Sequence, residues 1–408
     1  MGGVTVLDLS KNVFETLRRD PDFVLYRGRN IDDASQILVL SPATVNPSSI
    51  SLGRLEREYS LRQMLDSAWS ARPVGMVNYL DRPVLILEDP GGVPLDQLLH
   101  QGLDLTSSLR LAVKLSASIE CLHRTGLIHK DIKPANVLVD SLNSGCWLTG
   151  FGIASQLPRE RQSAEPPEVL AGTLAYMAPE QTGRMNRSTD SRSDLYSLGV
   201  LLYEMLTGTL PFLASDPMEW VHCHIARKPV PAAERSSRVP KSVSAIVIKL
   251  LAKTGEERYQ TAAGVNSDLQ RCLTEWEKDG RIGDFPLGAH DVPDRLLIPE
   301  KLYGRVREID TLVSSFDRVA TSGRSELVLV SGYAGIGKSS VVHEIHKVLV
   351  PPRGLFASGK FDQYKRDIPY ATLAQAFQSL IRPLLSKSEE ELSKWRNALH
   401  EALDPNGQ

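Results

Sequence analysis

The charged and polar residues of one short segment, 127–139, have types and a spacing that suit phosphoryl transfer. The segment reads LIHKDIKPANVLV. Asp131 can accept the proton of an attacking hydroxyl, Lys133 can reach the transferred phosphate, and Asn136 can hold a metal ion on the same side of the loop. The apolar residues at both ends predict short buried strands that pin this loop. Because several fixed positions match in order, the pattern indicates a catalytic loop and not a solvated turn with scattered charges.

The elements that must position this loop follow it in the sequence. LTGFGIAS, residues 148–155, lies where a metal-binding Asp-Phe-Gly motif is expected, but its first position is Gly150. GTLAYMAPEQ, residues 172–181, contains the Ala-Pro-Glu that ends an activation segment. Residues 190–212 predict a buried helix, because their apolar residues recur at helical spacing. The side chains expected to point inward are Leu195, Leu198, Leu201, Leu202 and Met205.

From about residue 20 to residue 275 the sequence resembles the Ser/Thr protein kinases. The resemblance implies a bilobal protein-kinase-like α+β fold. It also implies that Glu180 pairs with Arg258, that Asp194 braces the catalytic loop, and that Glu58 is the helix glutamate of the N-terminal lobe. The other residues that match structural motifs of the family are His129, Phe151 and Gly152.

Three parts of the phosphate and metal site of that family are missing from this sequence. Kinases cover the phosphates with a glycine-rich loop, contact them with a lysine on the third strand and bind Mg²⁺ with an aspartate. Residues 12–113 contain no lysine, and Val39 and Leu40 occupy its expected position after a region with a single glycine. Gly150 has no side chain that could bind a metal ion. Asn136 is therefore the remaining, weak candidate for a Mg²⁺ ligand.

These missing groups leave two hypotheses for the kinase-like domain. Phosphoryl transfer depends on positioning and charge neutralisation, and deleting one well-placed electrostatic element lowers a rate by about 10²- to 10³-fold. The first hypothesis is slow transfer of phosphate from ATP to protein hydroxyls through Asp131, Lys133 and Asn136. The alternative is a catalytically inactive pseudokinase that relays signals through protein interactions. Under either hypothesis, Glu58 pairs with a nearby arginine or is solvated.

A second nucleotide site is indicated near the end of the sequence. SELVLVSGYAGIGKSS, residues 325–340, predicts a buried parallel strand, a glycine-rich turn and the start of a helix. In this pattern backbone amides cradle the phosphates, Lys338 reaches the β- and γ-phosphates, and the Ser339 hydroxyl binds Mg²⁺. ATP and Mg²⁺ are therefore the expected cofactors. The predicted nucleotide-binding residues are Gly332, Gly335, Gly337, Lys338, Ser339 and Ser340.

The order of these modules resembles the N-terminal part of a family of large bacterial signalling proteins. The resemblance rests on TGRMNRSTDSRSDLYSLGV at residues 182–200, YGRVRE at residues 303–308, the P-loop, and GKFDQYKRDIPYATLAQAF at residues 359–377. Members of that family carry a Ser/Thr kinase-like domain, an AAA-type ATPase, often a GAF sensor, and a C-terminal histidine kinase. The resemblance implies signalling, ATP binding and further C-terminal sensor and histidine kinase domains.

The expected organisation places a complete kinase-like domain before an incomplete α/β P-loop NTPase domain. An apolar strand ending in an acidic residue does not follow the P-loop, so we expect this sequence to be a fragment. The predicted parts are an N-terminal segment at 1–19, the kinase-like domain at 20–276, a linker at 277–300 and the ATPase domain at 301–408.

Composition is consistent with a cytoplasmic signalling protein. The formal net charge of −2 does not indicate a nucleic-acid or anionic-membrane surface. The sequence contains no signal pattern and no apolar run of membrane-spanning length. Its four cysteines are scattered without metal-ligand spacing, so we expect them to be reduced. The expected partners are ATP and protein substrates or signalling proteins.

Overall fold

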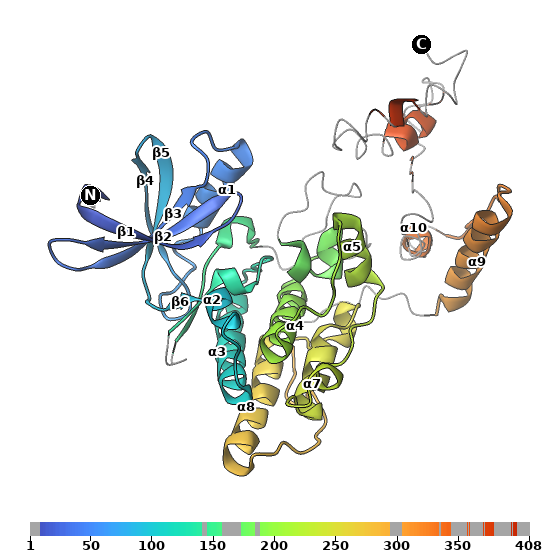
Figure 1. Ribbon diagram of the computed structural model, residues 1–408. Helices are drawn as coiled ribbons and strands as arrows, with labels where there is room; N and C mark the ends of the chain where they lie inside the picture. The colour runs from blue at the N-terminus through green and yellow to red at the C-terminus, as the bar shows by residue number, and fades with distance from the viewer. Residues whose placement is uncertain are drawn as a thin grey trace. The chain divides into compact units, whose positions relative to one another are not determined.

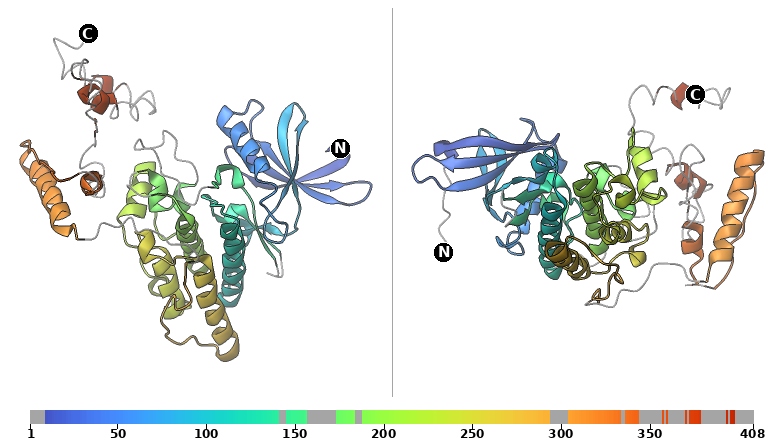
Figure 2. Two further views of the ribbon diagram at one scale, coloured as in Figure 1. Left: turned by 180° about the vertical axis from the view of Figure 1, so that it is seen from behind. Right: turned by 60° about the horizontal axis from the view of Figure 1, so that its bottom comes forward.

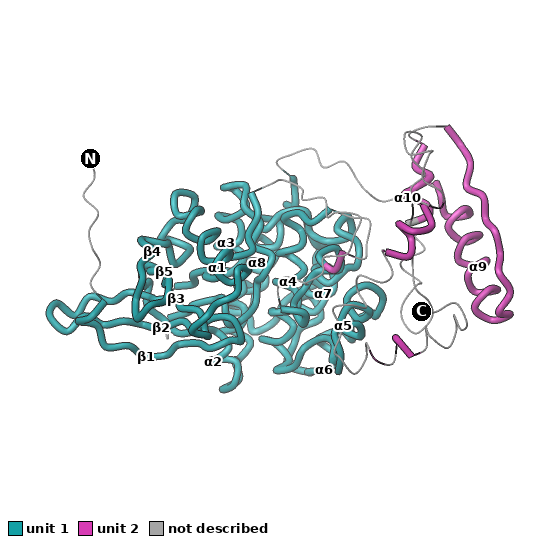
Figure 3. The backbone as a smooth tube through the Cα atoms, turned by 90° about the horizontal axis from the view of Figure 1, so that it is seen from above, with its two compact units in different colours: residues 1–161, 171–181, 187–301 teal, residues 162–170, 182–186, 302–408 magenta. Residues whose placement is uncertain are grey.

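The computed structural model divides into two compact units. It describes residues 9–140, 145–156, 173–183, 188–293, 304–333 and 336–343, together with 357, 359, 370, 372–378, 393 and 395–397. Unit 1 comprises residues 1–161, 171–181 and 187–301, and unit 2 comprises residues 162–170, 182–186 and 302–408 (Figure 3).

A five-stranded antiparallel sheet and one helix form the N-terminal lobe of unit 1 (Figure 1). The spatial order of the strands is β1-β2-β3-β5-β4. Helix α1 (Ser49–Ser60) begins after Ser48, whose side chain accepts a hydrogen bond from the backbone N–H of Ser51. The strands are β1 (Asn12–Arg19), β2 (Phe23–Asn30), β3 (Gln36–Pro42), β4 (Pro73–Tyr79) and β5 (Arg82–Glu88).

The two faces of this sheet bury different side chains. Leu38 and Leu40 of β3 lie in one apolar cluster with Leu55 of α1. Val39 of β3 lies in the cluster on the other face, with Val84 and Ile86 of β5. This separation follows from the two-residue period of a strand. Leu40 therefore occupies, on the α1 side of the sheet, the position where a kinase lysine is expected.

The C-terminal lobe of unit 1 is helical (Figure 2), and it contributes most of the largest apolar cluster among the described residues. Helix α4 (Ser191–Thr207) confirms the buried helix predicted within 190–212, and all five of its predicted inward side chains are buried. It begins after the capping side chain of Asp190 and ends at Gly208, whose φ of 70° suits glycine. The other helices are α2 (Leu95–Leu99), α3 (Leu105–Arg124), α5 (Pro217–Ile225), α6 (Ala232–Arg235), α7 (Lys241–Leu250) and α8 (Ala262–Asp279).

Unit 1 also contains a small three-stranded sheet and several short 3-10 turns, some of which adjoin the catalytic loop. The apolar residues after the loop form β7, as predicted, whereas Ile128 before it makes an isolated bridge with Ser155. Two backbone hydrogen bonds of 2.9 Å connect Ile128 and Ser155. The strands are β6 (Val93–Pro94), β7 (Val137–Val139) and β8 (Cys146–Leu148). The turns are η1 (Leu9–Lys11), η2 (Pro134–Asn136), η3 (Phe151–Ile153), η4 (Leu174–Tyr176), η5 (Pro179–Thr182) and η6 (Gly255–Glu257).

The chain after α8 packs back onto the C-terminal lobe. The Ser242 hydroxyl donates to the carbonyl of Gly283 over 2.8 Å. Asp291 accepts hydrogen bonds from the backbone N–H groups of Gln260 and Thr261. Residues 281–293 have neither helix nor strand, yet these contacts attach them to unit 1.

The described part of unit 2 contains α9 (Val306–Ser322) and α10 (Lys338–His343), which contact each other. The predicted buried strand at 326–332 is wrong for this structure, because these residues form no strand and Leu327 and Leu329 are 97% and 86% exposed. A parallel strand needs neighbouring strands and covered faces, and the described residues of unit 2 offer no second strand. Across the described ranges, no helix is both long and apolar enough to cross a membrane.

Candidate functional site

Asp194 at the start of α4 holds the catalytic loop in place. Its carboxylate accepts the backbone N–H groups of His129 and Lys130 over 2.9 and 2.8 Å. The His123 ring lies 2.9 Å from the same carboxylate. Burial by itself raises the pKa of Asp194, but the contact with His123 outweighs it, and the pKa is lowered. Because Lys130 has a φ of 68°, this anchored turn holds an unusual backbone conformation.

The structure brings the three predicted catalytic residues together. The Asp131 carboxylate accepts a hydrogen bond from Nδ2 of Asn136 over 2.9 Å and lies 2.9 Å from the ammonium of Lys133. Its other oxygen accepts the backbone N–H of Thr173 over 3.1 Å. Lys133 also donates to the Thr173 hydroxyl over 2.6 Å. Asp131 is therefore oriented by three neighbours, one of them from the activation segment.

His129 and Phe151 connect the catalytic loop to the turn η3. The buried His129 ring lies 3.0 Å from the carbonyl of Thr149, and its centroid is 4.7 Å from that of Phe151. Burial lowers the pKa of His129 and favours its neutral form. Helix α1 packs on η3, where Arg57 donates to the carbonyl of Ala154 over 3.0 Å. These contacts place α1 close to the catalytic loop.

Gly150 lies directly against Asn136. A Cβ atom at position 150 would lie 2.7 Å from Oδ1 of Asn136, and the φ of Gly150 is 80°. Both the short approach and the left-handed backbone favour glycine. An aspartate here therefore requires Asn136 to move, so the missing metal ligand is not restored by a simple substitution.

Arg18, at the end of β1, is a site residue that the sequence motifs did not predict. Its Nη1 donates to the carbonyl of Ala135 over 2.6 Å and to Oδ1 of Asn136. The side-chain oxygen of Asn136 accepts from the cationic guanidinium, which repels a metal cation from this oxygen, while Nδ2 of Asn136 faces Asp131. With Gly150 beside it, this arrangement does not fit the Mg²⁺ ion that Asn136 was predicted to bind. The signal available in the sequence was an arginine pair, Arg18 and Arg19, in a lysine-free stretch.

Glu58 of α1 is buried among these groups, with 1% of the residue exposed. The alternative that it is solvated is therefore wrong. Its Oε1 has no hydrogen-bond partner. Desolvation raises the pKa of Glu58 from 4.5 to about 7, against the opposing effects of the Phe151 backbone N–H and the Arg18 charge. A cation that fully compensated this carboxylate would have lowered the pKa, so Arg18 does not replace the lysine partner of Glu58.

Replacing Glu58 with glutamine is expected to stabilise the protein above pH 7 and to have little effect at pH 4. The raised pKa means that the folded state keeps a proton that the unfolded state releases, so Glu58 reduces the free energy of unfolding as pH rises from 4.5 to about 7. We expect a gain of about 1–3 kcal/mol at pH 8 from a shift of this size. Urea denaturation at pH 4 and pH 8 measures it. Glu56→Gln, on the exposed side of the same helix, is the control. Equal effects of Glu58→Gln at both pH values would contradict the prediction.

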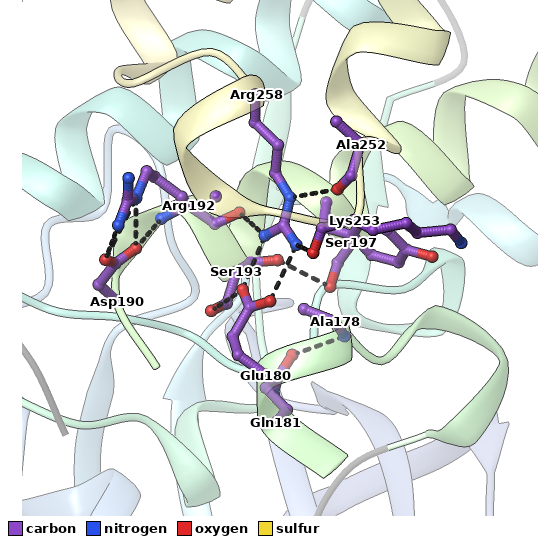
Figure 4. A network of polar contacts seen from close by, with 12 residues as sticks. Ala178, Glu180, Gln181, Asp190, Arg192, Ser193, Ser197, Ala252, Lys253 and Arg258 are labelled. Atoms are coloured by element: carbon purple, nitrogen blue, oxygen red, sulfur yellow. Dashed lines mark hydrogen bonds and ion pairs between the residues drawn. The ribbon is translucent and has the colours of Figure 1, made fainter. Parts of the chain in front are cut away.

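A buried ion pair fixes the end of the activation segment (Figure 4). Glu180 and Arg258 form two parallel hydrogen bonds of 2.7 and 2.8 Å, so the structure contains the pair implied by the family resemblance. The Ser193 hydroxyl donates to Glu180 over 2.6 Å, and Arg258 also donates to the carbonyls of Arg192 and Ala252. Burial favours the neutral form of Glu180, but Arg258 outweighs this effect and lowers the pKa of the carboxyl.

The predicted P-loop is described in part. Lys338 begins α10, and its ammonium donates to the carbonyls of Gly332 and Tyr333 over 2.9 Å each. Gly337 has a φ of 93°, which glycine adopts readily. Ser339 and Ser340 lie in the first turn of α10. Gly335 lies outside the described residues. Lys338 and Ser339 thus lie together at the helix start, where a phosphate and its Mg²⁺ would be held.

Comparison with known proteins shows two families along the chain. The protein kinase domain matches residues 41–269, and the AAA ATPase domain matches residues 301–408. Among curated proteins, the chain is 28% identical over 75% of its length to hybrid signal transduction histidine kinase G of Dictyostelium discoideum. It is 37% identical over 50% of its length to the serine/threonine-protein kinase PknB of Mycolicibacterium smegmatis, and 30% identical over 66% to PknB of Mycobacterium tuberculosis.

The chain spans 11%, 32% and 41% of the lengths of these three relatives, in the same order. The similarity to PknB therefore concerns a part of each protein, as does the similarity to the histidine kinase. The kinase match covers more than half of the 408 residues and includes α1, the catalytic loop and α4. The chain belongs to the protein kinase domain family, and an AAA ATPase domain follows its kinase domain.

Proposed function

We propose that this chain is the ATP-dependent front part of a signalling protein. In this proposal the kinase domain slowly transfers phosphate from ATP to serine or threonine hydroxyls of proteins, and the AAA domain acts as a nucleotide-controlled switch. The observation that carries the first part is the hydrogen-bonded arrangement of Asp131, Lys133 and Asn136. A proton acceptor that is oriented in this way supports catalysis only if a substrate hydroxyl and the phosphate of ATP are brought close to it.

The chain's own groups account for proton transfer and for positioning of the phosphate. One oxygen of Asp131 accepts the Thr173 N–H and the other contacts Asn136 and Lys133, which orients the carboxylate. Such a carboxylate can accept the proton of a substrate hydroxyl. Lys133 can exchange its contact with Thr173 for one with the transferred phosphate. The residues around Asn136 do not fit Mg²⁺, so no step of this proposal uses a metal ion in the kinase domain.

The pseudokinase alternative is favoured by one specific observation. Asn136 offers its side-chain oxygen to Arg18, and Gly150 offers no ligand. A kinase domain with this site transmits a signal through its surface and has no need of phosphoryl transfer. The two proposals differ in whether any phosphate reaches a hydroxyl.

Single-turnover incubation with ATP labelled on the γ-phosphate distinguishes them. The full chain carrying Lys338→Ala is used, so that the P-loop does not consume ATP, together with a serine- and threonine-rich acceptor protein. Slow appearance of phosphoserine or phosphothreonine supports the kinase proposal. Absence of label from every hydroxyl under these conditions supports the pseudokinase and rejects slow transfer.

Lys338→Ala is expected to remove one of two ATP sites in the chain. The ammonium now contacts two neutral carbonyls, and a charge-assisted contact with phosphate is stronger than either. We expect affinity at the P-loop to fall by about 10- to 100-fold, as loss of one or two charged hydrogen bonds implies. Titration calorimetry with Mg-ATP measures the number of sites. Arg324→Ala, an exposed cation in the same unit, is the control. An unchanged number of sites in Lys338→Ala would remove Lys338 from nucleotide binding.

A connection to a histidine kinase is part of the proposal. It is supported by the similarity to hybrid signal transduction histidine kinase G over 75% of this chain, which represents 11% of that protein. The sequence motifs at residues 182–200 and 359–377 support the same assignment. Phosphotransfer assays on the complete natural polypeptide, with and without Mg-ATP bound at the P-loop, test whether this chain controls a histidine kinase.

A further inference from the structure

The catalytic site of the kinase domain, called the cleft below because it lies where the N-terminal lobe meets the catalytic loop, contains a cation that no motif supplies. Leu40 occupies the position expected for the kinase lysine, and Gly150 the position expected for the metal-binding aspartate. Arg18 reaches the same place from β1, where its guanidinium contacts Ala135 and Asn136. The positive charge lost with the lysine is thus partly restored from another strand.

The guanidinium of Arg18 is buried but incompletely paired. The residue is 9% exposed, and its two hydrogen bonds go from Nη1 to neutral oxygens. Its Nε has no hydrogen-bond partner and forms only a long ion pair of 3.9 Å with Oδ2 of Asp20. A buried cation is costly unless it is paired and hydrogen-bonded. The guanidinium would therefore gain from an anionic ligand that lies closer to it than Asp20 does.

Arg27, on β2 of the same sheet, is a fully paired arginine with which Arg18 can be compared. Its guanidinium contacts both carboxylate oxygens of Asp89, over 2.5 and 3.0 Å, and donates to the carbonyl of Gly92 over 2.7 Å. Arg54 pairs with Asp22 over 2.8 Å. Compared with these two, Arg18 lacks a close acidic partner.

Neighbouring carboxylates compensate Arg18 only in part, because Oδ2 of Asp20 lies 3.9 Å from its Nε. Asp20 directs Oδ1 to the backbone N–H groups of Asp22 and Phe23, which form the β1–β2 turn. Glu58 has an unpaired Oε1, and its pKa of about 7 leaves it partly neutral near physiological pH. Arg18 consequently has no close and fully charged partner.

The end of β1 is held in a position that keeps Arg18 in the cleft. Gln97 of α2 donates to the carbonyl of Leu17 over 2.9 Å. The register of β1 against β2 shifts between Thr16 and Arg18, so Leu17 and Arg18 are both buried. An irregularity of this kind redirects a side chain that regular alternation would place on the other face.

We propose that Arg18 is a phosphate-contacting residue of the kinase domain that stands in for the missing lysine and metal ion, so that this cleft binds a nucleoside triphosphate without Mg²⁺. This inference rests on the proposed function in one respect, namely that the cleft takes up ATP. Arginine suits the role because its planar donors bind phosphate oxygens in pairs.

ATP binding by the full chain carrying Lys338→Ala, measured by equilibrium dialysis in excess Mg²⁺ and in excess EDTA, tests the proposal. The expected affinity is the same in both solutions to within about 3-fold, since the chelator removes no contact from the site. Arg18→Met in this background is expected to weaken binding by about 10- to 100-fold, and Arg18→Lys by less. Arg19→Met, the same charge change at the exposed neighbour, is expected to leave affinity unchanged.

Each contrary outcome overturns the proposal. Binding that requires Mg²⁺ would show that a metal ion is needed in spite of Arg18. Unchanged affinity of Arg18→Met for ATP would show that the guanidinium does not contact the nucleotide. Higher affinity would show that the guanidinium obstructs binding. Absence of ATP binding in the Lys338→Ala chain would show that the cleft takes up no nucleotide. Phosphate transfer is a separate measurement, so metal-free binding without transfer rejects slow kinase activity and leaves the role of Arg18 intact.

Discussion

Asp131→Asn is expected to lower phosphate transfer from ATP to protein hydroxyls by about 10²- to 10⁴-fold, the usual contribution of a positioned general base. Asparagine has nearly the same shape, and its oxygen can still accept a hydrogen bond from Thr173 or Asn136. It cannot take up a proton, and it does not form the ion pair with Lys133. The substitution therefore changes the chemistry of the site more than its geometry.

The measurement is the initial rate of phosphoserine and phosphothreonine formation in single turnover. The parent chain and the Asp131→Asn variant both carry Lys338→Ala. Asp279→Asn, at the exposed end of α8, is the control for loss of one carboxylate. Equal rates for Asp131→Asn and the parent chain would remove Asp131 from the mechanism. ATP affinity is measured in parallel, because a change in affinity alone would indicate lost binding and not lost proton transfer.

Glu180→Ala is expected to reduce the free energy of unfolding of unit 1 by about 3–5 kcal/mol, as breaking a buried ion pair does. The substitution leaves the guanidinium of Arg258, whose side chain is 0% exposed, without its two carboxylate contacts. The carbonyls of Arg192 and Ala252 remain as partners, but they carry no full charge. The activation segment also loses its connection to the C-terminal lobe through this pair.

The matched control is an exposed ion pair of similar length. Arg110 and Glu277 approach to 2.7 Å, with side chains that are 55% and 41% exposed. Glu277→Ala is expected to cost no more than about 1 kcal/mol, because solvent screens such pairs. Urea denaturation followed by the fluorescence of Trp69, Trp147, Trp220 and Trp276, which lie in unit 1, measures both. Effects of the same small size at the two pairs would contradict the prediction.

Removing both charges of the buried pair separates two effects: the cost of leaving one buried charge uncompensated and the contribution of the ion pair itself. The double variant Glu180→Leu with Arg258→Met is expected to recover a large part of the stability lost in Glu180→Ala, because it leaves no uncompensated buried charge. A double variant as unstable as the single one would show that the shape of the pair matters more than its charge.

Local patterns in the sequence determined much of the kinase domain. The catalytic loop was recognisable because its chemistry requires Asp131, Lys133 and Asn136 at short fixed spacings. Helix α4 was recognisable from apolar periodicity and its capping residues, which act within one or two turns. The absent lysine and the glycine at position 150 were equally visible, since each is a residue type at a position along the chain.

Other features depended on contacts between distant residues. The apolar run at 326–332 predicted a strand, but a strand forms only where other strands pair with it, and the described part of unit 2 has none. Glu58 reads equally well as a surface residue of a helix. Its burial follows from the packing of α1 on η3, which composition alone does not reveal.

The sequence by itself determined the family, the catalytic loop and the absence of the lysine and the metal-binding aspartate. Only the tertiary structure decided what occupies the resulting site. Arg18 and Asn136 are 118 residues apart, and they meet because an irregularity in β1 directs Arg18 into the cleft. A shift of one residue in a strand moves a side chain to the opposite face. No local pattern specifies that shift, because it depends on pairing with β2 and on the contacts that hold the end of β1.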